Sequence, residues 1–343
     1  MNREQALQLL AWYEKEKRIL PWREEPTPYH VWLSEIMLQQ TRIEAVKPYY
    51  QRFLTAFPTI ESLAKAEEET VLKLWEGLGY YSRARNLQKA AKLIVSSFGG
   101  NVPNDPEDLS ALPGIGEYTR NAILAIAFQK PCIAVDGNLL RVYARLESKR
   151  FSAITPALKK EAGAFFEKAF PLLSPGDFNQ ALMDLGELVC LPNGNPLCHV
   201  CPCASFCKAR QKGNEESYPG KRSKKEKKSE DVDVFLLAKD GKYAIQKREE
   251  NGLLAGLYQF PNIMKRTSAK ERLAWLESHG LRVIKEEAAG EAKHIFTHLV
   301  WNMKGYRIEI SGEANDFLFV SLDEIKGKYS LPSAFSYFLK KLN

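Results

Sequence analysis

The spacing of apolar residues changes once along this chain, and that change limits the possible folds more than any other feature. Up to about residue 200, apolar residues recur every three to four positions, which is typical of helices. From 231 onward the pattern is that of strands, as in 232–238 (VDVFLLA). Between the two patterns, 211–230 is polar and rich in lysine, as in a solvated linker. The sequence therefore predicts a multidomain protein, with an all-α domain (1–210) followed by an α+β domain (231–343).

The elements expected within each domain follow from these periods. Helical patterns in the first domain cover 3–20, 29–40, 42–56, 59–66, 69–76, 83–98, 118–128, 155–170 and 177–189. In the second domain, strands are expected at 232–238, 243–248, 281–286, 291–300, 303–311 and 317–321, and helices at 268–279 and 331–342.

Length and charge set the broad class of protein. A chain of 343 residues suggests two or three domains, and its 45% apolar content is enough for real cores. No apolar run reaches the ~18 to 20 residues of a membrane span. The N-terminal residues lack the basic region and apolar stretch of a signal peptide, so we expect a cytoplasmic protein. A net charge of +7 permits a nucleic-acid partner without demonstrating one.

A Gly-x-Gly turn, Gly114-Ile115-Gly116, stands between two helical patterns in the region of about 108–128. Glycine lets the backbone turn tightly and approach a ligand closely. The amides of such a turn and of the helix that follows can bind a phosphate. One helix later comes Asp136, a carboxylate that such a site could use, although aspartate is equally common as a helix N-cap. The turn alone is weak evidence for function, because short glycine turns between helices are common.

A glutamate, Glu35, lies in the middle of the helical pattern 29–40. Its neighbours are the apolar residues Trp32, Leu33, Ile36 and Met37. Burial among them would disfavour the carboxylate and raise its pKa, which suits a general acid. The residues alone leave open that Glu35 is exposed on the polar face of an amphipathic helix.

Five of the six cysteines crowd into the segment 190–207. In a cytosolic protein such crowding favours a metal site over disulfides. The spacing Cys190-x7-Cys198-x2-Cys201-x5-Cys207 has one close pair and two longer arms, which favours a four-iron, four-sulfur (4Fe-4S) cluster over zinc. The fifth cysteine, Cys203, offers a competing ligand.

Several motifs together resemble the helix-hairpin-helix DNA glycosylases, and among them the adenine DNA glycosylases of the MutY family. They are the glycine turn with its downstream aspartate, the segment 33–41 (LSEIMLQQT) and the turn 77–81 (GLGYY). The resemblance covers nearly the whole chain. It implies a monomeric base-excision-repair enzyme with one 4Fe-4S cluster that removes adenine opposite 8-oxoguanine or guanine from double-stranded DNA. The second domain resembles Nudix hydrolases but lacks their run of glutamates near 270–277, so we expect it to recognise 8-oxoguanine without hydrolase chemistry.

The resemblance also implies the chemical roles. A glycosylase flips the nucleotide out of the duplex, and two carboxyl groups in different protonation states suit cleavage of the glycosidic bond. Glu35 would be the acid that protonates adenine, Asp136 the carboxylate that faces the sugar, and Tyr118 and Asn138 the residues that steady both. The related glycosylase-lyases carry a lysine where Tyr118 stands. Since tyrosine cannot form a Schiff base, we predict a monofunctional enzyme.

Further contacts are implied by motif position alone. Those expected to bind adenine are Trp22, Arg23 and Gln180, and those expected to bind DNA are Gln40, Tyr80, Gly114, Ile115 and Gly116. Those expected to recognise 8-oxoguanine are Phe296, Thr297 and His298, and those expected to hold the cluster are Cys190, Cys198, Cys201 and Cys207. The chain departs from the family twice. It has seven residues instead of six in the first cysteine gap, and Thr297 stands where serine is frequent.

Three other functions remain open on the sequence. A lyase-type glycosylase for oxidised pyrimidines is disfavoured by Tyr118 and by the second domain. A nucleotide pyrophosphohydrolase is disfavoured by the missing glutamates. A non-catalytic iron–sulfur DNA-binding protein would have no use for both Glu35 and Asp136.

Overall fold

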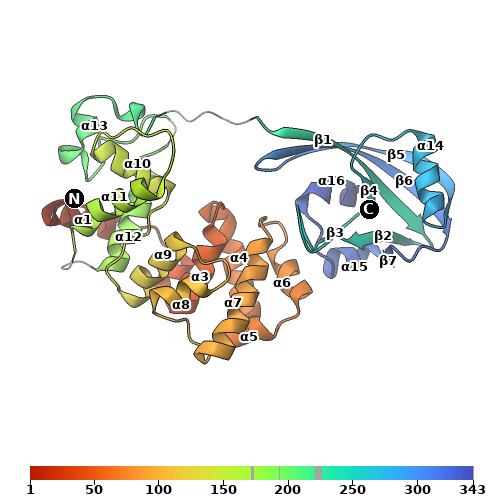
Figure 1. The fold of residues 1–343 in the computed structure, drawn as a ribbon, viewed down its shortest axis with the longest axis horizontal. Coiled ribbons are helices and arrows are strands. Elements are labelled where there is room, and N and C mark those ends of the chain that lie inside the picture. Colours follow the sequence, from red (N-terminus) through yellow and green to blue (C-terminus); the bar gives the residue numbers. More distant parts are fainter. Residues whose placement is uncertain (171–173, 193, 221–225, 343) are drawn as a thin grey trace. The chain divides into compact units, whose positions relative to one another are not determined.

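The computed structural model describes residues 1–170, 174–192, 194–220 and 226–342 (Figure 1). The chain divides into two compact units. The first consists of Met1–Lys65 and Asn86–Ser223, and the second of Ala66–Arg85 and Lys224–Asn343. The segment 66–85 therefore packs with the C-terminal part, although the sequence pattern places it in the helical domain. In the described residues, no helix has the length and apolar content that crossing a membrane requires.

Helices make up the N-terminal part, and within the described residues no strand precedes Lys228, as predicted. The helices are α1 (Arg3–Glu16), α2 (Pro21–Glu24), α3 (Pro28–Leu38), α4 (Ile43–Ala56), α5 (Ile60–Lys65), α6 (Glu68–Trp75), α7 (Ser82–Phe98), α8 (Pro106–Ala111), α9 (Glu117–Phe128), α10 (Gly137–Leu146), α11 (Pro156–Glu167), α12 (Pro175–Asp184) and α13 (Lys208–Gln211). A π-helical turn, η1 (Leu185–Val189), continues α12, and two 3₁₀ turns follow, η2 (Ala204–Phe206) and η3 (Glu215–Ser217).

Several of these helices begin at the same short sequence signal, a capping side chain followed by proline. Thr27, Thr155 and Ser174 each accept a hydrogen bond from an amide of the first turn, and proline fills the first helical position of α3, α11 and α12. The cap satisfies an amide that has no partner within the helix, and proline already has a helical φ. Asp136 caps α10 in the same way, and the sequence analysis did not predict that helix.

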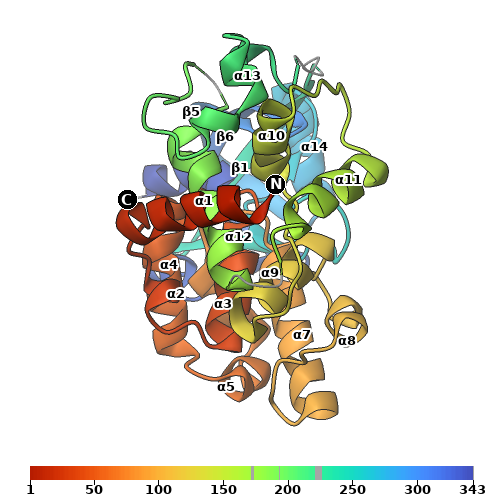
Figure 2. The ribbon, with the colours of Figure 1, turned by 90° about the vertical axis from the view of Figure 1, so that its left-hand side faces the viewer.

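One hydrophobic core of the first unit is formed by α1, α10, α11 and α12 (Figure 1, Figure 2). Its fully buried aromatic side chains include Phe166 and Phe178. Cys203 and Cys207 belong to the same core, so the cysteine loop packs directly against the helices. Tyr218 also packs there, which places part of the predicted 211–230 linker in the first unit. Within that linker, 221–225 lie outside the described residues.

The second unit contains a mixed sheet with the strand order β3-β2-β1-β6-β5 (Figure 1). Its strands are β1 (Lys228–Lys239), β2 (Lys242–Lys247), β3 (Tyr258–Gln259), β4 (Asn262–Ile263), β5 (Leu281–Ile295), β6 (Leu299–Gly312) and β7 (Leu318–Val320). The parallel pairing of β1 with β6 and the antiparallel pairing of β6 with β5 form the body of the sheet. Helix α14 (Ala269–Ser278) agrees with the prediction.

Two expectations for this unit are wrong. The strands predicted at 281–286 and 291–300 are largely one strand, β5, because irregularities at 283–285 and 288–290 break the alternation without ending the pairing. The single helix predicted at 331–342 is three short pieces, η4 (Ser333–Phe335), α16 (Ser336–Leu339) and η5 (Lys340–Leu342). A further helix, α15 (Leu322–Gly327), starts at a capping box formed by Ser321 and Glu324.

Candidate active site

Glu35 lies on α3 and is buried, with 6% of its surface exposed. The alternative of a glutamate on a solvent-exposed helix face is therefore excluded. Burial raises the pKa of Glu35 to about 7, because the charged form loses its hydration. The neighbouring Tyr118 hydroxyl acts against this increase in pKa, whereas the charge of Asp136 adds to it. A carboxyl group with this pKa can hold or release a proton near neutral pH.

The glycine turn joins α8 to α9 and brings Tyr118 to the site. Gly114 has φ +83°, and a Cβ on it would lie 3.0 Å from Asn86 Cβ, so a side chain is strongly disfavoured there. Because the Ile115 side chain is buried, a ligand at this turn would contact its backbone. Gly116 caps α9 without a side chain. Tyr118 then stands in the first turn of α9, where its hydroxyl donates to Met183 Sδ at 3.9 Å and it lines the same cavity as Glu35.

Asp136 is at once a helix cap and part of the site. Its Oδ1 accepts a hydrogen bond from the Leu139 amide at 2.7 Å, which fixes the start of α10. Burial raises the pKa of Asp136, while the amides of Leu139 and Asn138 act in the opposite direction. Capping and catalysis, which are alternatives on the sequence alone, are compatible for Asp136, because a carboxylate has two oxygens and capping uses one.

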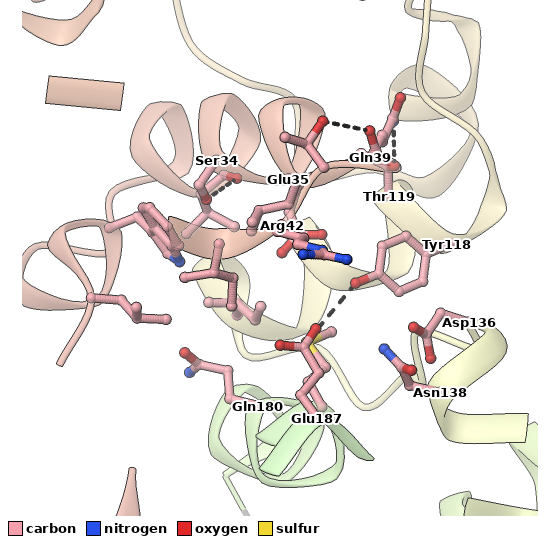
Figure 3. A pocket seen from close by; sticks show the side chains of 18 of the residues that line it. Ser34, Glu35, Gln39, Arg42, Tyr118, Thr119, Asp136, Asn138, Gln180 and Glu187 are labelled. Atoms are coloured by element: carbon pink, nitrogen blue, oxygen red, sulfur yellow. Dashed lines mark hydrogen bonds between the residues drawn. The ribbon is translucent and has the colours of Figure 1, made fainter. Parts of the chain in front are cut away.

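These side chains converge on one cavity of about 790 Å³, to which α3, α9, α10, α12 and η1 contribute (Figure 3). All seven residues expected to act on adenine or the sugar line it. They are Trp22, Arg23, Glu35, Tyr118, Asp136, Asn138 and Gln180, together with the expected DNA contacts Gln40 and Gly116.

Three acidic or basic residues that the sequence analysis missed hold the wall of this cavity. Asp184 is fully buried and binds Arg23, with distances of 2.8 and 3.0 Å to its guanidinium nitrogens. Arg18 also binds Asp184, and its Nη1 reaches Glu187 Oε2 at 2.7 Å. The sequence did contain a signal for these residues. One face of the helical pattern 177–189 carries Gln180, Met183, Asp184 and Glu187. This mostly polar face on an otherwise apolar helix indicates a functional surface.

Asn138 connects the cavity to the cysteine loop. Its Oδ1 accepts a hydrogen bond from Arg141 Nη2 at 3.0 Å. The same guanidinium donates to the carbonyl oxygens of Gly186, at 2.6 Å, and Cys190, at 2.8 Å. A Cβ on Gly186 would lie 3.0 Å from Asn138 Cβ, so glycine permits this close approach. The cavity and the cysteine loop therefore share one buried arginine.

The cysteine loop itself surrounds a second, much smaller cavity. All five clustered cysteines line it: Cys190, Cys198, Cys201, Cys203 and Cys207. Arg145 Nη1 donates to Cys190 Sγ at 3.2 Å. In the parts of the chain that the structure describes, no three His, Cys, Asp or Glu side chains are grouped to hold a single metal ion. The thiols nevertheless provide the donor set of an iron–sulfur cluster in one enclosed place.

Of the predicted residues outside the cavity, Gly114 and Ile115 belong to the first unit, and Tyr80, Phe296, Thr297 and His298 to the second. Phe296, Thr297 and His298 form the tip that joins β5 to β6. The Tyr80 hydroxyl lies 2.7 Å from Thr297 Oγ1. Tyr80 has φ +49° and Gln40, in the first unit, has φ +57°. Such a backbone is uncommon for residues other than glycine and often marks a functional position.

Comparisons with known proteins agree with this architecture. Residues 33–166 match the HhH-GPD superfamily of base excision DNA repair proteins, and 233–341 match the NUDIX domain. The chain is similar to the adenine DNA glycosylase of Homo sapiens, with 33% identity over 89% of this chain and 67% of that protein. It is also similar to the adenine DNA glycosylase of Buchnera aphidicola subsp. Baizongia pistaciae, with 35% identity over 85% and 82% of the two chains.

Among solved structures, a thermostable thymine-DNA glycosylase aligns with a TM-score of 0.54 and 28% identity, over 60% of this chain and 95% of that one. A non-covalent endonuclease III–DNA complex aligns with a TM-score of 0.53 and 23% identity, over 62% and 98%. At that identity the second comparison shows the shared fold alone.

Proposed function

Since the chain belongs to the adenine DNA glycosylase family, we propose that it removes adenine paired with 8-oxoguanine or guanine in duplex DNA and leaves an abasic site without cutting the strand. One observation carries the proposal. A single cavity is lined by Glu35, whose burial raises its pKa to about 7, by a second carboxyl group, Asp136, and by Tyr118.

The chemistry follows from the two protonation states. The protonated Glu35 donates to a ring nitrogen of the extruded adenine, so the base leaves as a neutral purine when the bond to the sugar breaks. The sugar then carries an oxocarbenium-like positive charge, which the Asp136 carboxylate stabilises from the other side. Water adds to the sugar carbon and gives its proton to Glu35, which restores the enzyme. Arg141 and the α10 amides favour the charged form of Asp136.

The base would be held by the cavity wall next to Glu35. Gln180 has an amide that both donates and accepts hydrogen bonds, which suits the edge of adenine. Arg23 is oriented by Asp184, and Trp22 packs edge-on against Tyr50 with ring centres 5.4 Å apart. These contacts fix the orientation of two adenine-binding side chains before the base arrives, which reduces the entropy that binding must overcome.

The absence of strand cutting rests on the composition of the cavity. Strand cleavage by a lyase needs an amine that attacks the sugar carbon. Tyr118 stands at the start of α9, and the described residues that line the cavity include arginines but no lysine. A guanidinium stays protonated and does not form a Schiff base.

Two finer parts of the proposal concern the cysteines and the second unit. Cys190, Cys198, Cys201 and Cys207 would hold a 4Fe-4S cluster, which supplies a structural link between the loop and the helical core. Thr297, Phe296 and His298 would contact 8-oxoguanine from the β5–β6 tip, with Tyr80 beside them.

A duplex containing one adenine opposite 8-oxoguanine tests the proposed function directly. We expect alkali-labile abasic sites from the wild-type enzyme, a slower reaction opposite guanine, and none from Glu35→Gln. Without alkali the strand stays intact, and borohydride traps no protein–DNA adduct. Efficient strand cleavage, a borohydride-trapped adduct, or full activity of Glu35→Gln would contradict the proposal.

A further inference from the structure

The cysteine loop holds one thiol more than a 4Fe-4S cluster needs. Five cysteines line its cavity, whereas the cluster takes four thiolates. The extra residue, Cys203, is 1% exposed and belongs to the core of the first unit. A thiol held inside a cluster cavity has the chemistry of a ligand, so its position requires an explanation beyond packing.

Cys203 and Cys201 lie on one tight turn. The Ala204 amide donates to the Cys201 carbonyl oxygen at 3.1 Å, and this bond closes the turn. Both cysteines line the small cavity, as do Cys190 and Cys207. Cys203 therefore faces the same cavity as Cys201 from the same turn.

Cys198 has different surroundings, which makes it a useful contrast. It lines the same cavity but precedes the turn that Cys201 and Cys203 share. It is also not among the cysteines that pack against the core of the first unit. Cys201 therefore has the extra thiol on its own turn, whereas Cys198 does not.

We propose that Cys203 is a reserve ligand of the cluster, which takes the place of Cys201 when the bond between Cys201 and its iron breaks. This inference rests on the cluster that the proposed function includes. In the exchange, the iron–sulfur bond to Cys201 breaks and a new bond to Cys203 forms. The released Cys201 thiolate takes up the proton that the Cys203 thiol gives up on binding iron. Iron keeps its oxidation state, so the exchange needs no oxidant or reductant.

Iron and sulfide content of the full-length protein, purified without oxygen, tests the proposal together with the visible absorption of the cluster. The variants are Cys201→Ala, Cys203→Ala, the double variant of both, and Cys198→Ala as the matched control. We expect both single variants at the turn to keep the iron content of the wild type. The double variant and Cys198→Ala should lose most of it, because no second thiol covers the missing ligand.

Any other pattern of iron content among the variants contradicts the proposed role of Cys203 as a reserve ligand. Loss of iron from Cys201→Ala alone shows that Cys203 cannot replace it, and loss from Cys203→Ala shows that Cys203 is a resident ligand. Full iron in the double variant shows that neither thiol is needed. A wild-type protein without iron refutes the cluster itself, which is a failure of the proposed function and is recognised before any variant is compared.

Release of iron to a chelator provides a second measurement that does not depend on the folding of Cys201→Ala. Wild-type protein and Cys203→Ala are compared at equal helical content by circular dichroism. We expect release to be several-fold faster from Cys203→Ala, because no neighbouring thiol recaptures an iron that has lost Cys201. Equal rates in the two proteins overturn the proposal.

Discussion

The cavity of the first unit and the β5–β6 tip of the second unit hold their polar side chains in opposite ways. In the cavity, Glu35 is 6% exposed and Asp184 is fully buried, and partners on neighbouring elements fix both. At the tip, Thr297 is exposed and Tyr80 is 43% exposed, although their hydroxyl groups lie 2.7 Å apart. Water competes for the second set of contacts and not for the first.

This difference separates what each region can contribute. Buried groups have shifted pKa values and large interaction energies, so small changes in the cavity should alter the chemical step. Exposed hydrogen bonds contribute about 0.5 to 1.5 kcal/mol each, which is enough to choose between similar bases but not to drive a reaction. We therefore expect changes in the cavity to alter the rate of base removal and changes at the tip to alter only the preference for the opposite base.

The largest effect should come from Asp136→Asn. Asparagine caps helices as well as aspartate does, so the start of α10 should survive. The negative charge that stabilises the sugar is lost, and we expect the single-turnover rate to fall by about 10²- to 10³-fold, the range seen when a preorganised electrostatic contact is removed. The measurement is adenine release under single-turnover conditions, with the melting temperature recorded on the same sample.

Thr155→Ala is the matched control for capping, because Thr155 caps α11 away from the cavity. It should cost about 1 kcal/mol of stability and leave the rate unchanged. If Asp136→Asn and Thr155→Ala lowered stability alike and neither slowed the reaction, Asp136 would be a cap and nothing more.

The next effect is structural and concerns Asp184→Asn. Arg18 and Arg23 bind this buried carboxylate, and the substitution removes the negative charge that both guanidinium groups contact. Breaking a buried ion pair costs about 3 to 5 kcal/mol, so we expect a clear loss of unfolding free energy in urea. Because Arg23 loses its anchor, KM for the duplex should rise more than kcat falls. Glu44→Gln, which breaks an exposed pair with Lys47, should change stability by less than about 1 kcal/mol. Similar losses from both variants would contradict the role of burial.

The pH dependence should reveal the buried acid. Because Glu35 must carry a proton to donate it, activity should fall as pH rises through about 7, the raised pKa of Glu35. The free energy of unfolding should also fall as pH rises. The neutral side chain contributes fully below the ordinary pKa of 4.5, and this contribution of about 3 kcal/mol is lost as pH rises through about 7. Glu35→Gln should remove this slope from the unfolding free energy measured across pH. An unchanged slope would show that Glu35 is not the group that titrates.

Local signals in the sequence predicted much of the fold. The change of period located the helical and strand-rich parts, and capping residues followed by proline mark helix starts that can be recognised locally. Helix α10 was not predicted, although its N-cap, Asp136, is a residue that commonly starts a helix. The last helix was predicted too long, because nothing in its apolar pattern shows where a helix breaks into short turns.

The polar network of the cavity was harder to predict than the side chains that line it. Arg18 and Asp184 are 166 positions apart, and no local pattern indicates that they meet. Cys201 and Cys203 are neighbours in the sequence, so their competition was visible at once, but which of them is buried depends on how the loop packs against the core. Local chemistry is thus readable from sequence, whereas pairing across the fold is not.

The smallest effect should come from the β5–β6 tip, where Thr297→Val and Tyr80→Phe each remove one hydroxyl at almost constant shape. We expect the rate preference for 8-oxoguanine over guanine to fall about twofold to tenfold in each, in keeping with one exposed hydrogen bond. Since the two hydroxyl groups are partners, the double variant should lose little more than either single one. Thr55→Val, an exposed control in α4, should leave the preference unchanged. Equal slowing on both duplexes, or additive losses in the double variant, would show that the hydroxyl pair does not read the opposite base, and the division between cavity and tip would then have to be redrawn.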